Sequence, residues 1–541
     1  MWFPGFSGLR NEQSLTLNEQ INRIAHQFEY TDADVNKGVN EFLRQIAEGL
    51  EKDGTSLSQI PTYVTDVPNG TEKGLYMAVD LGGTNFRVCS IKLNGDGSFY
   101  LTSTKVPIPK ELMVAKTAPE LFAFLARQIE AFLQKHHSEK FEAHIRRRMT
   151  ASSPLGFRDE NVFRMGFTFS FPVQQVGINK GTLIRWTKGF DIPDAVGKDV
   201  CALLQAEIDK LHLPVRIAAL VNDTVGTLMA RSYGAPGKHG AVLGAIFGTG
   251  TNGAYVEQLS KVKKSLLGDY DNSTGKMIIN TEWGSFDNEL NVLPNTPWDV
   301  EVDKITPNPG LQMYEKRVSG MFLGEIVRQV LLDLLKNPNV PLFKDVDSRS
   351  NDWLSTTEIS ERSAIYKAWG LDTSVLSIAA IDNSPGLSPL RGALESALDI
   401  SSPSFEDAQA FKTIAEAVVR RAARLSAVAI AAIVLQTGKL TDPDLADEPI
   451  DIGVDGSLVE HYPRFMEMIY EALRAVDGIG EEGAKRIRIG IARDGSGVGA
   501  ALIALVAGRM EKASDVSGIS ELRSTATIDE ENEGAISESS E

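Results

Sequence analysis

Hydrophobic and polar positions follow two different periods along the chain, and each period predicts a kind of element. Residues 118–137 place apolar side chains at the three- and four-residue intervals of an amphipathic helix. Residues 14–52 show similar spacing and are expected to be helical. Short, nearly continuous apolar runs at 450–455 and 487–492 are typical of buried strands, and each precedes a glycine turn. The mixture predicts an α/β protein.

Two segments far apart in the chain repeat one pattern. Each has an apolar strand, a glycine-rich turn that ends in Thr-Asn, and a strand that runs back. The first pair of strands is expected at 75–80 and 86–92, and the second at 241–247 and 254–257. A weak internal duplication of this type suggests two related lobes that face one another. The length of 541 residues also exceeds the usual size of a single core, so two lobes are the default expectation.

Composition and charge narrow the class of protein. The 55 Lys and Arg against 72 Asp and Glu give a formal net charge of −17. Nucleic-acid and anionic-membrane surfaces need clustered positive charge, so we expect no partner of either kind. The apolar runs at 427–435 and 500–507 are much shorter than the ~20 residues of a membrane helix. The N-terminus lacks the pattern of a secretory signal, and Cys89 and Cys201 are expected to be reduced core thiols, which indicates a cytoplasmic protein.

The glycine turn at 248–253 fits the G-x-G-x-x-G pattern of dinucleotide-binding folds. That pattern needs a helix after the turn, whereas residues 254–257 are expected to form a strand, so a nicotinamide-dependent dehydrogenase is disfavoured. The chain also lacks the G-x-x-x-x-G-K-[ST] loop of the P-loop kinases. What remains is a hairpin turn whose glycines let the backbone approach a phosphate group closely.

Either turn alone would be interpreted as an ordinary glycine-rich hairpin. Two such turns in facing lobes could instead hold a nucleotide triphosphate from both sides. Asp80 and Arg87 flank the first turn. Asp80 could hold a Mg²⁺-bound water, and Arg87 could neutralise charge that develops on a transferred phosphoryl group. The pair of turns therefore favours a nucleotide site.

The first turn, Asp-Leu-Gly-Gly-Thr-Asn-Phe-Arg at 80–87, resembles the first phosphate motif of the hexokinase family. Further motifs of that family follow in order, at 169–172 (Phe-Ser-Phe-Pro), 183–190 (Leu-Ile-Arg-Trp-Thr-Lys-Gly-Phe), 220–227 (Leu-Val-Asn-Asp-Thr-Val-Gly-Thr), 248–252 (Gly-Thr-Gly-Thr-Asn), 280–287 (Asn-Thr-Glu-Trp-Gly-Ser-Phe-Asp) and 453–457 (Gly-Val-Asp-Gly-Ser). The resemblance covers roughly residues 15–510. The sequences of the segments 279–286 and 308–325 are more similar to those of the fungal glucokinase branch than to those of the general hexokinases.

The resemblance implies a two-lobed, actin-like (ribonuclease-H-like) α/β sugar kinase fold, in which a sugar and MgATP meet in the cleft between lobes that close on the sugar. It divides the chain into an N-terminal half, 1–220, and a C-terminal half, 221–510. The first half would hold most of the small lobe, the first phosphate turn and a sugar-binding segment. The second would hold the large lobe, the second phosphate turn and the adenosine site. The Ser- and acid-rich residues 511–541 cannot bury enough apolar surface and are expected to be a disordered tail.

The same resemblance implies the site residues. The sugar contacts would be Ser170, Thr187, Lys188, Asn222, Asp223, Asn252, Glu282 and Glu315. Asp223 would take the proton of the 6-hydroxyl, and Lys188 would bridge the sugar and the transferred phosphate. The ATP contacts would be Asp80 (which would also hold Mg²⁺ through water), Gly82, Gly83, Thr84, Asn85, Arg87, Gly248, Thr249, Gly250, Gly453, Asp455, Gly456, Ser457, Gly495 and Ser496.

Three of these acids have ordinary structural interpretations when each is taken alone. Asp223 could cap a helix that begins at Thr224. Glu282 could be a solvated residue at a strand end. Glu315 opens a Glu-Lys-Arg run, which is typical of a solvated helix face. The order of the motifs, rather than any one residue, therefore carries the functional interpretation.

The implied activity is ATP-dependent phosphorylation of glucose, and also of mannose, at the 6-hydroxyl, which is the first step of glycolysis. One alternative is a broad-specificity hexokinase that also uses fructose. Another is a glucose-sensing regulatory protein on the same fold, although such a protein would be expected to lose a catalytic motif, and Asp223, Lys188 and both turns are intact. An actin- or chaperone-type ATPase would lack the segments at 186–190 and 280–284. Both a monomer and a homodimer are compatible with the sequence.

Overall fold

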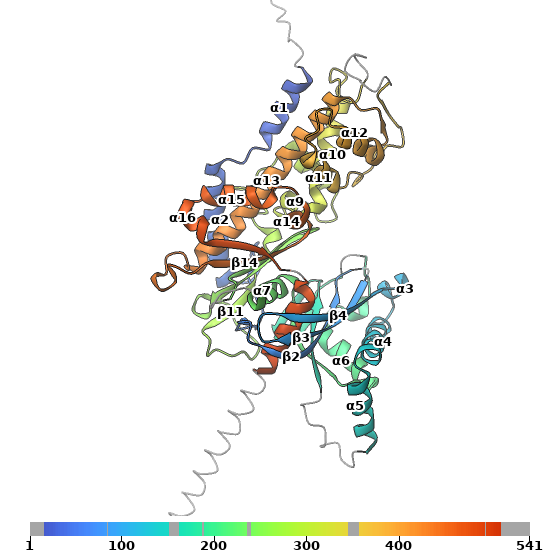
Figure 1. Cartoon of the computed structure of the whole chain (residues 1–541), viewed down its shortest axis with the longest axis vertical. Helices are drawn as coiled ribbons and strands as arrows, with labels where there is room; N and C mark the ends of the chain where they lie inside the picture. The colour runs from blue at the N-terminus through green and yellow to red at the C-terminus, as the bar shows by residue number, and fades with distance from the viewer. Residues whose placement is uncertain are drawn as a thin grey trace, which may run out of the picture.

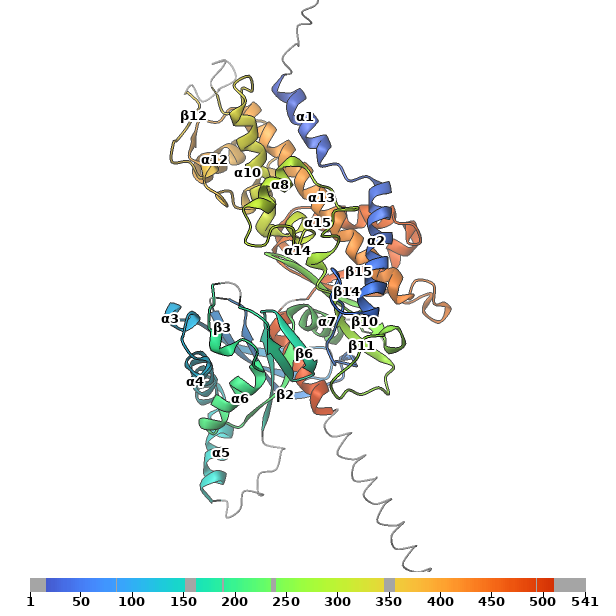
Figure 2. The ribbon, with the colours of Figure 1, turned by 180° about the vertical axis from the view of Figure 1, so that it is seen from behind.

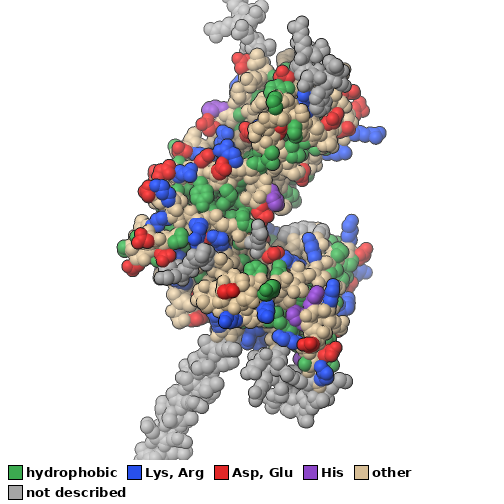
Figure 3. All heavy atoms as spheres, in the orientation of Figure 1, with side chains coloured by type: hydrophobic (Ala, Val, Ile, Leu, Met, Phe, Trp, Pro, Cys, Tyr) green, Lys and Arg blue, Asp and Glu red, His purple; other side chains and the backbone are tan. Residues whose placement is uncertain are grey.

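Two lobes, each built on its own β-sheet, make up the protein in a computed structural model (Figure 1). The structure describes residues 16–83, 85–150, 162–186, 189–234, 240–344, 356–492 and 494–509. The space-filling view shows a notch between the lobes on one side of the surface (Figure 3). No helix within these described ranges is both long enough and apolar enough to cross a membrane.

The lower lobe of Figure 1 holds a five-stranded sheet in the order β4-β3-β2-β5-β8. Its strands are β2 (Lys73–Leu81), β3 (Asn85–Asn94), β4 (Phe99–Pro107), β5 (Phe163–Phe169) and β8 (Val215–Val221). The pairs β2–β3 and β3–β4 are antiparallel, whereas β2–β5 and β5–β8 are parallel. The lobe is completed by α3 (Lys110–Met113), α4 (Ala118–His136), α5 (Ser138–Thr150), α6 (Val200–Lys210) and the hairpin of β6 (Val173–Gly177) and β7 (Lys180–Leu183).

The upper lobe holds a six-stranded sheet in the order β1-β11-β10-β9-β14-β15. Its strands are β1 (Ile60–Pro61), β9 (Leu243–Phe247), β10 (Thr251–Gln258), β11 (Lys276–Asn280), β14 (Ile450–Asp455) and β15 (Ile487–Ile491). A small separate pair is formed by β12 (Glu358–Ile359) and β13 (Ile400–Ser401). Its helices are α1 (Leu17–Gln27), α2 (Asp32–Glu51), α8 (Pro297–Lys304), α9 (Glu315–Val318), α10 (Gly320–Lys336), α11 (Ser374–Ile381), α12 (Ser388–Leu398), α13 (Phe405–Thr437), α14 (Ser457–His461), α15 (Phe465–Arg474) and α16 (Gly480–Arg486).

The 33-residue helix α13 forms the centre of the upper lobe. Ser404 and Asp407 begin it with a reciprocal capping box, which satisfies backbone N–H groups that have no partner within the helix. Its Ala-rich stretch at 427–434 is fully buried, and small side chains there let neighbouring helices approach closely. Figure 2 shows α1 and α2 running alongside this helix, although they belong to the start of the chain.

Most elements predicted from the hydrophobic pattern are confirmed, including both strand–glycine–strand units, the strands at 450–455 and 487–492, and the helix at 118–137. The expectation of a helix across 14–52 needs a correction, because α1 ends at Gln27 and α2 begins at Asp32. Thr31 and Asp34 form a capping box that starts a new helix there. Cys89 and Cys201 are both free and buried. The tail at 511–541 lies outside the described residues.

The helix α7 (Asp223–Gly234) follows β8 and lies on the upper sheet, between the two lobes (Figure 1). Three glycines on neighbouring strands, Gly244, Gly453 and Gly490, are register partners and form a trough beneath it. A Cβ atom at Gly244 would lie 2.3 Å from the backbone nitrogen of Leu228, and one at Gly453 would lie 2.5 Å from Cβ of Arg231. The absence of side chains at these positions lets the helix rest directly on the strands.

The opposite side of α7 contacts a second helical segment, 495–509, that packs against the lower sheet. A Cβ atom at Gly499 would lie 2.1 Å from the carbonyl oxygen of Gly226, and one at Gly166 of β5 would lie 2.1 Å from the carbonyl oxygen of Ala500. The helix that begins at Asp223 is therefore fixed by backbone contacts on both of its sides.

Because of this trough, we expect two Gly-to-Ala replacements to change the free energy of unfolding in opposite directions. We expect Gly453→Ala to lower the free energy of unfolding by about 1–3 kcal/mol, because the added methyl group must displace α7. Gly392→Ala in α12 is the matched control, since no atom from outside its own stretch of helix backbone lies within 4 Å of its Cβ position, and a gain of up to about 1 kcal/mol is expected from helix propensity. Thermal melting of both variants would test this, and equal midpoints would contradict it.

Candidate active site

The turn between β8 and α7 presents Asn222 and Asp223 at the carboxyl end of the lower sheet. The Oδ1 atom of Asn222 accepts hydrogen bonds from the backbone N–H of Thr224 at 3.0 Å and from its hydroxyl group at 2.6 Å. Asn222 therefore caps α7, and the helix begins at Asp223 itself rather than at Thr224. A capping role does not depend on Asp223, although its Oδ1 also accepts from the Thr224 N–H at 2.9 Å.

The second glycine turn joins β9 to β10 and lies against the start of α14. The N–H of Gly248 donates to the carbonyl oxygen of Gly250 at 3.0 Å, which closes the turn. Gly456 has a φ of +114°, and a Cβ atom there would lie 2.7 Å from the Gly248 nitrogen. Glycine is needed at this position both for the conformation and for the close approach. The structure thus brings together two predicted ATP-binding segments, 248–250 and 453–457.

Acidic side chains from three elements gather near this turn. Burial raises the pKa of Asp455 above its ordinary value, and the negative charges of Glu460, Asp223 and Asp494 act in the same direction. Such mutual influence requires that Asp223 at the head of α7 and Asp455 at the end of β14 lie in one region. Within the described residues, no three of these acidic side chains are close enough together to hold a metal ion by themselves, so a cation here would need ligands from a bound nucleotide.

A network of side-chain amides surrounds Glu282, just after β11. The Nδ2 group of Asn252 donates to Oδ1 of Asn280 at 2.8 Å and to Oε1 of Glu282 at 3.2 Å. The Nδ2 group of Asn280 also donates to Oε1 of Glu282, at 2.8 Å. The Oδ1 atom of Asn252 in turn accepts from the N–H of Gly253 at 2.8 Å. Asn252 and Glu282, both predicted sugar contacts, are therefore parts of one hydrogen-bonded group.

Glu282 is held in an unusual backbone conformation, with a φ of +53°. Burial of its carboxyl group raises its pKa; hydrogen bonds from Asn280 and Asn252 lower it, and the charge of Asp223 raises it. Trp283 is fully buried beside it, where its indole Nε1–H donates to the hydroxyl group of Thr251 at 3.0 Å. These contacts contradict a simple solvated strand end.

Glu315 reaches the second glycine turn from α9. Its Oε2 atom accepts a hydrogen bond from the N–H of Thr251 at 2.9 Å and would lie 2.8 Å from a Cβ atom at Gly250. The next two residues, Lys316 and Arg317, are 3% and 1% exposed. The interpretation of this Glu-Lys-Arg run as a solvated helix face is therefore wrong, because all three side chains are engaged inside the upper lobe.

The first glycine turn lies between β2 and β3, where Asp80 and Arg87 are register partners. A Cβ atom at Gly82 would lie 3.3 Å from Oδ1 of Asp80 and 3.6 Å from Oγ of Ser170, so this glycine keeps open a space between two predicted ligands. The guanidinium group of Arg87 donates to Oδ1 of Asp494 at 2.8 Å. Residues predicted to hold ATP from the lower lobe thus contact the segment that carries Gly495 and Ser496. Thr84, Thr187 and Lys188 lie outside the described residues.

One residue of this region, Asn280, was not among the predicted ligands, and a second, Asp494, belongs to the turn 494–497 that was predicted to contact the adenosine. Asn280 lies between Asn252 and Glu282, and Asp494 pairs with Arg87. A signal for Asn280 was present, because it opens the Asn-Thr-Glu-Trp-Gly segment and is two residues from Glu282. No local signal identifies the partner of Asp494, since Arg87 is 407 positions away.

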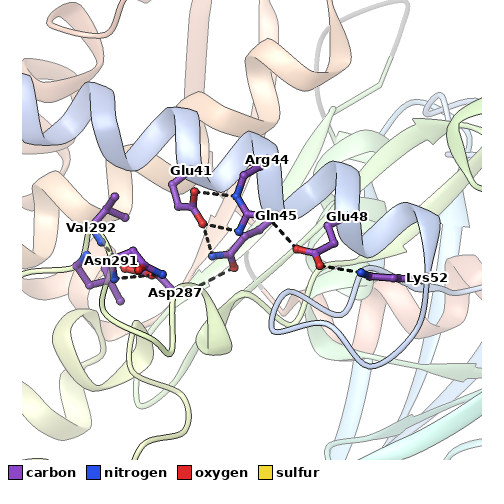
Figure 4. A network of polar contacts seen from close by, with 9 residues as sticks. Glu41, Arg44, Gln45, Glu48, Lys52, Asp287, Asn291 and Val292 are labelled. Carbon is purple, nitrogen blue, oxygen red and sulfur yellow. Dashed lines mark hydrogen bonds and ion pairs between the residues drawn. The ribbon is translucent and has the colours of Figure 1, made fainter.

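The loop that follows Glu282 is anchored to the start of the chain (Figure 4). The N–H of Asp287 donates to Oε1 of Gln45 on α2 at 3.3 Å, and the Asp287 carboxylate accepts backbone N–H groups of the next turn, from Asn291, Val292 and Leu293. A cavity of about 270 Å³ opens beside this contact. Arg44 on its wall pairs with Glu41 and Glu48, and Lys52 also pairs with Glu48, so the charges on this face balance one another.

Comparison with known proteins agrees with these features. Two models of the family described as hexokinase match residues 20–233 and 242–506. The chain is 59% identical over 501 residues to a glucokinase of Aspergillus niger, across 92% of this chain and 99% of the relative. It is 40% identical over 526 residues to glucokinase-1 of Saccharomyces cerevisiae, across 93% and 100%. A solved hexokinase from Schistosoma mansoni complexed with glucose has a TM-score of 0.71 and 34% identity, across 90% and 98%.

The architecture and the relatives lead to the same assignment. Two sheets, each with its own glycine turn, and the solved hexokinase that superposes on most of the chain confirm the two-lobed, actin-like α/β sugar kinase fold. The two matched segments together span both lobes. The chain belongs to the hexokinase family, within its fungal glucokinase branch.

Proposed function

We propose that this protein transfers the γ-phosphoryl group of ATP to the 6-hydroxyl of glucose, and also of mannose, as the first step of glycolysis. The observation that supports the proposal is the group of Asn252, Glu282 and Glu315 at the second glycine turn, with the charge of Asp223 acting on Glu282. A neutral polyol is recognised by such groups, because each hydroxyl both donates and accepts a hydrogen bond. The likeness to fungal glucokinases supports glucose as the acceptor.

In this proposal Asp223 is the catalytic base. Its carboxylate takes the proton of the 6-hydroxyl as that oxygen bonds to the γ-phosphorus, and the bond from the γ-phosphorus to the leaving ADP oxygen breaks. Lys188 bridges the sugar and the transferred group. The remaining sugar contacts are Ser170, Thr187, Asn222, Asn252, Glu282 and Glu315. Holding both reactants in line lowers the entropic part of the barrier.

ATP would lie between the two glycine turns, with Mg²⁺ carried on its phosphates. A single carboxylate, Asp80, suits this ion, because protein-bound Mg²⁺ keeps several waters and takes most other ligands from the substrate. The open space that Gly82 leaves beside Asp80 is compatible with such a water-mediated contact. When bound, the ion would neutralise charge on the phosphates. Arg87 and the N–H groups of both turns would contact the phosphates, and residues 453–457 and 495–496 the adenosine.

The proposal extends to the setting of the reaction. The halves 1–220 and 221–510 would supply the two walls of the site, and the protein would act in the cytoplasm as a monomer or homodimer. Small molecules, glucose and ATP, would be its partners. The net charge of −17 makes nucleic acid and anionic membranes unfavourable partners.

An ADP-release assay with glucose, mannose and fructose tests this function. We expect turnover of glucose and mannose, with kcat/KM for fructose lower by about 10-fold or more, because an acceptor with displaced hydroxyls leaves buried polar groups unpaired. Comparable rates with fructose would favour a broad-specificity hexokinase. Glucose binding without turnover would indicate the sensing protein, and neither binding nor turnover would contradict the proposal.

A further inference from the structure

Asn280, the last residue of β11, has a connecting position in the amide network. Asn280 is only 6% exposed. Its Nδ2 group donates a hydrogen bond to Oε1 of Glu282 at 2.8 Å, and its Oδ1 atom accepts one from Nδ2 of Asn252 at 2.8 Å. Its backbone is flanked on both sides, by Ala254 of β10 and by Ile60 of β1. Asn280 is therefore a rigid point from which a neighbouring side chain can be oriented.

Glu282 itself lies beyond the strand, in a left-handed backbone conformation with a φ of +53°. Within the part of the chain that the structure describes, the hydrogen bonds that Asn280 and Asn252 donate to its carboxylate both end on Oε1. This arrangement fixes the rotation of the carboxylate and leaves Oε2 to accept a hydroxyl group. The hydrogen bond from the Asn280 amide to Oε1 thus leaves Oε2 of Glu282 as the oxygen that faces the substrate hydroxyl.

The charged surroundings of Glu282 make this support necessary. Asp223 at the head of α7 is negative, and Glu315 of α9 packs nearby, with its Cβ 3.4 Å from the Cβ position of Gly284. Burial and the charge of Asp223 both raise the pKa of Glu282, whereas the N–H group of Asn280 lowers it. A protonated carboxyl group would lose acceptor capacity toward the sugar.

We propose that Asn280 is a positioning residue for the sugar site, which holds the Glu282 carboxylate ionised and turned toward the acceptor sugar. Asn280 acts through Glu282 and does not itself need to touch the substrate. The inference rests on the proposed hexokinase activity and assigns to that site a residue that governs how sugar affinity depends on pH.

Steady-state kinetics of the full-length Asn280→Ala variant, between pH 5.5 and 8.5, test the inference. We expect KM for glucose to rise by about 10-fold at neutral pH, since one hydrogen bond to a charged group is lost. The kcat and the KM for ATP should stay within about 3-fold. The acid limb of kcat/KM for glucose should move upward by about 1 pH unit, because Glu282 now protonates more readily.

Asn36→Ala provides the matched control. Asn36 is a partly buried asparagine that makes two tertiary hydrogen bonds, to Ala475 and Asp477, and its replacement should leave both KM values and the pH profile unchanged. If Asn280→Ala fails to fold, the isosteric Asn280→Asp keeps the shape, removes the donor and adds charge, so KM for glucose should rise further. An unmoved acid limb with unchanged KM, or a fall in kcat alone, would overturn the role.

Calorimetric binding of glucose at pH 6 in two buffers of different ionisation enthalpy separates this inference from the proposed activity. Glucose binding to Asn280→Ala should release more protons than binding to the unmodified protein, because Glu282 must ionise to accept the sugar. Equal proton release would overturn the inference. An unmodified protein that binds glucose but does not phosphorylate it would overturn the proposed function and leave the calorimetric test of Asn280 in force.

Discussion

The Asp223→Asn variant should phosphorylate glucose with a kcat lower by about 10²–10⁴, which is the usual contribution of a general base. The amide keeps the size of the side chain and an oxygen for the N–H of Thr224, so α7 should form normally. It cannot take up the hydroxyl proton at neutral pH. The KM for glucose should change much less than kcat, because the removed interaction develops mainly in the transition state. The ADP-release assay measures both.

Asp199→Asn is the matched control for this variant. Asp199 also opens a helix, α6, where its Oδ1 accepts the N–H of Cys201 at 2.9 Å, and it is not a predicted site residue. Its replacement should leave kcat within about 2-fold. Retention of more than about one tenth of normal activity by Asp223→Asn would show that another group accepts the proton.

The Asp299→Ala variant should lose about 3–5 kcal/mol of stability, because it leaves a buried arginine without its counter-charge. Asp299 accepts two hydrogen bonds of 2.7 Å from the Arg421 guanidinium group, and the side chains are 1% and 0% exposed. Burial already lowers the pKa of nearby Arg317 to about 10, and Asp299 counteracts that effect. Without Asp299, two buried guanidinium groups would share an uncompensated charge. Thermal and denaturant melting would measure the loss.

Glu301→Ala in the same helix, α8, is the control, since the pair of Glu301 and Lys304 is 54% and 61% exposed and should contribute less than about 1 kcal/mol. Burial tends to raise the pKa of Asp299, but the charge and hydrogen bonds of Arg421 outweigh it, so the net shift is downward. The pair therefore contributes fully at neutral pH and is lost only in strong acid, below the ordinary pKa of Asp. Similar melting of the two Ala variants would contradict this account.

The fold was largely predictable because its signals are local. Strands beside the glycine turns are apolar runs bounded by residues that favour turns, and α4 has a clear helical period. The break between α1 and α2 is also encoded locally, in the capping box of Thr31 and Asp34, but helical spacing on either side conceals it when periodicity alone is considered. Helical periodicity and capping residues must therefore be considered together to place the boundary between two consecutive helices.

The candidate site was less predictable, because its contacts join distant segments. Glu315 belongs to a run that resembles a solvated helix face, and only tertiary contacts bury it: Lys316 meets Asp303, and Arg317 meets the carbonyl oxygen of Pro294. The connecting role of Asn280 requires the pairing of β10 with β11, which places Asn252 next to it. Residue types were readable from the motifs, whereas the hydrogen-bonded partners were not.

The glycine trough beneath α7 has a mechanical consequence. A helix that packs on a sheet through side chains can slide as those side chains change rotamer. In contrast, α7 packs directly on the backbone of β9 and β14 at Gly244 and Gly453. We therefore expect α7 and the upper sheet to travel as one rigid body whenever the lobes move. Asp223 would then keep its geometry with Glu282 throughout a catalytic cycle. The acceptor groups of the upper lobe would be assembled in advance, whereas those of the lower lobe, such as Ser170, would move toward them as the lobes close.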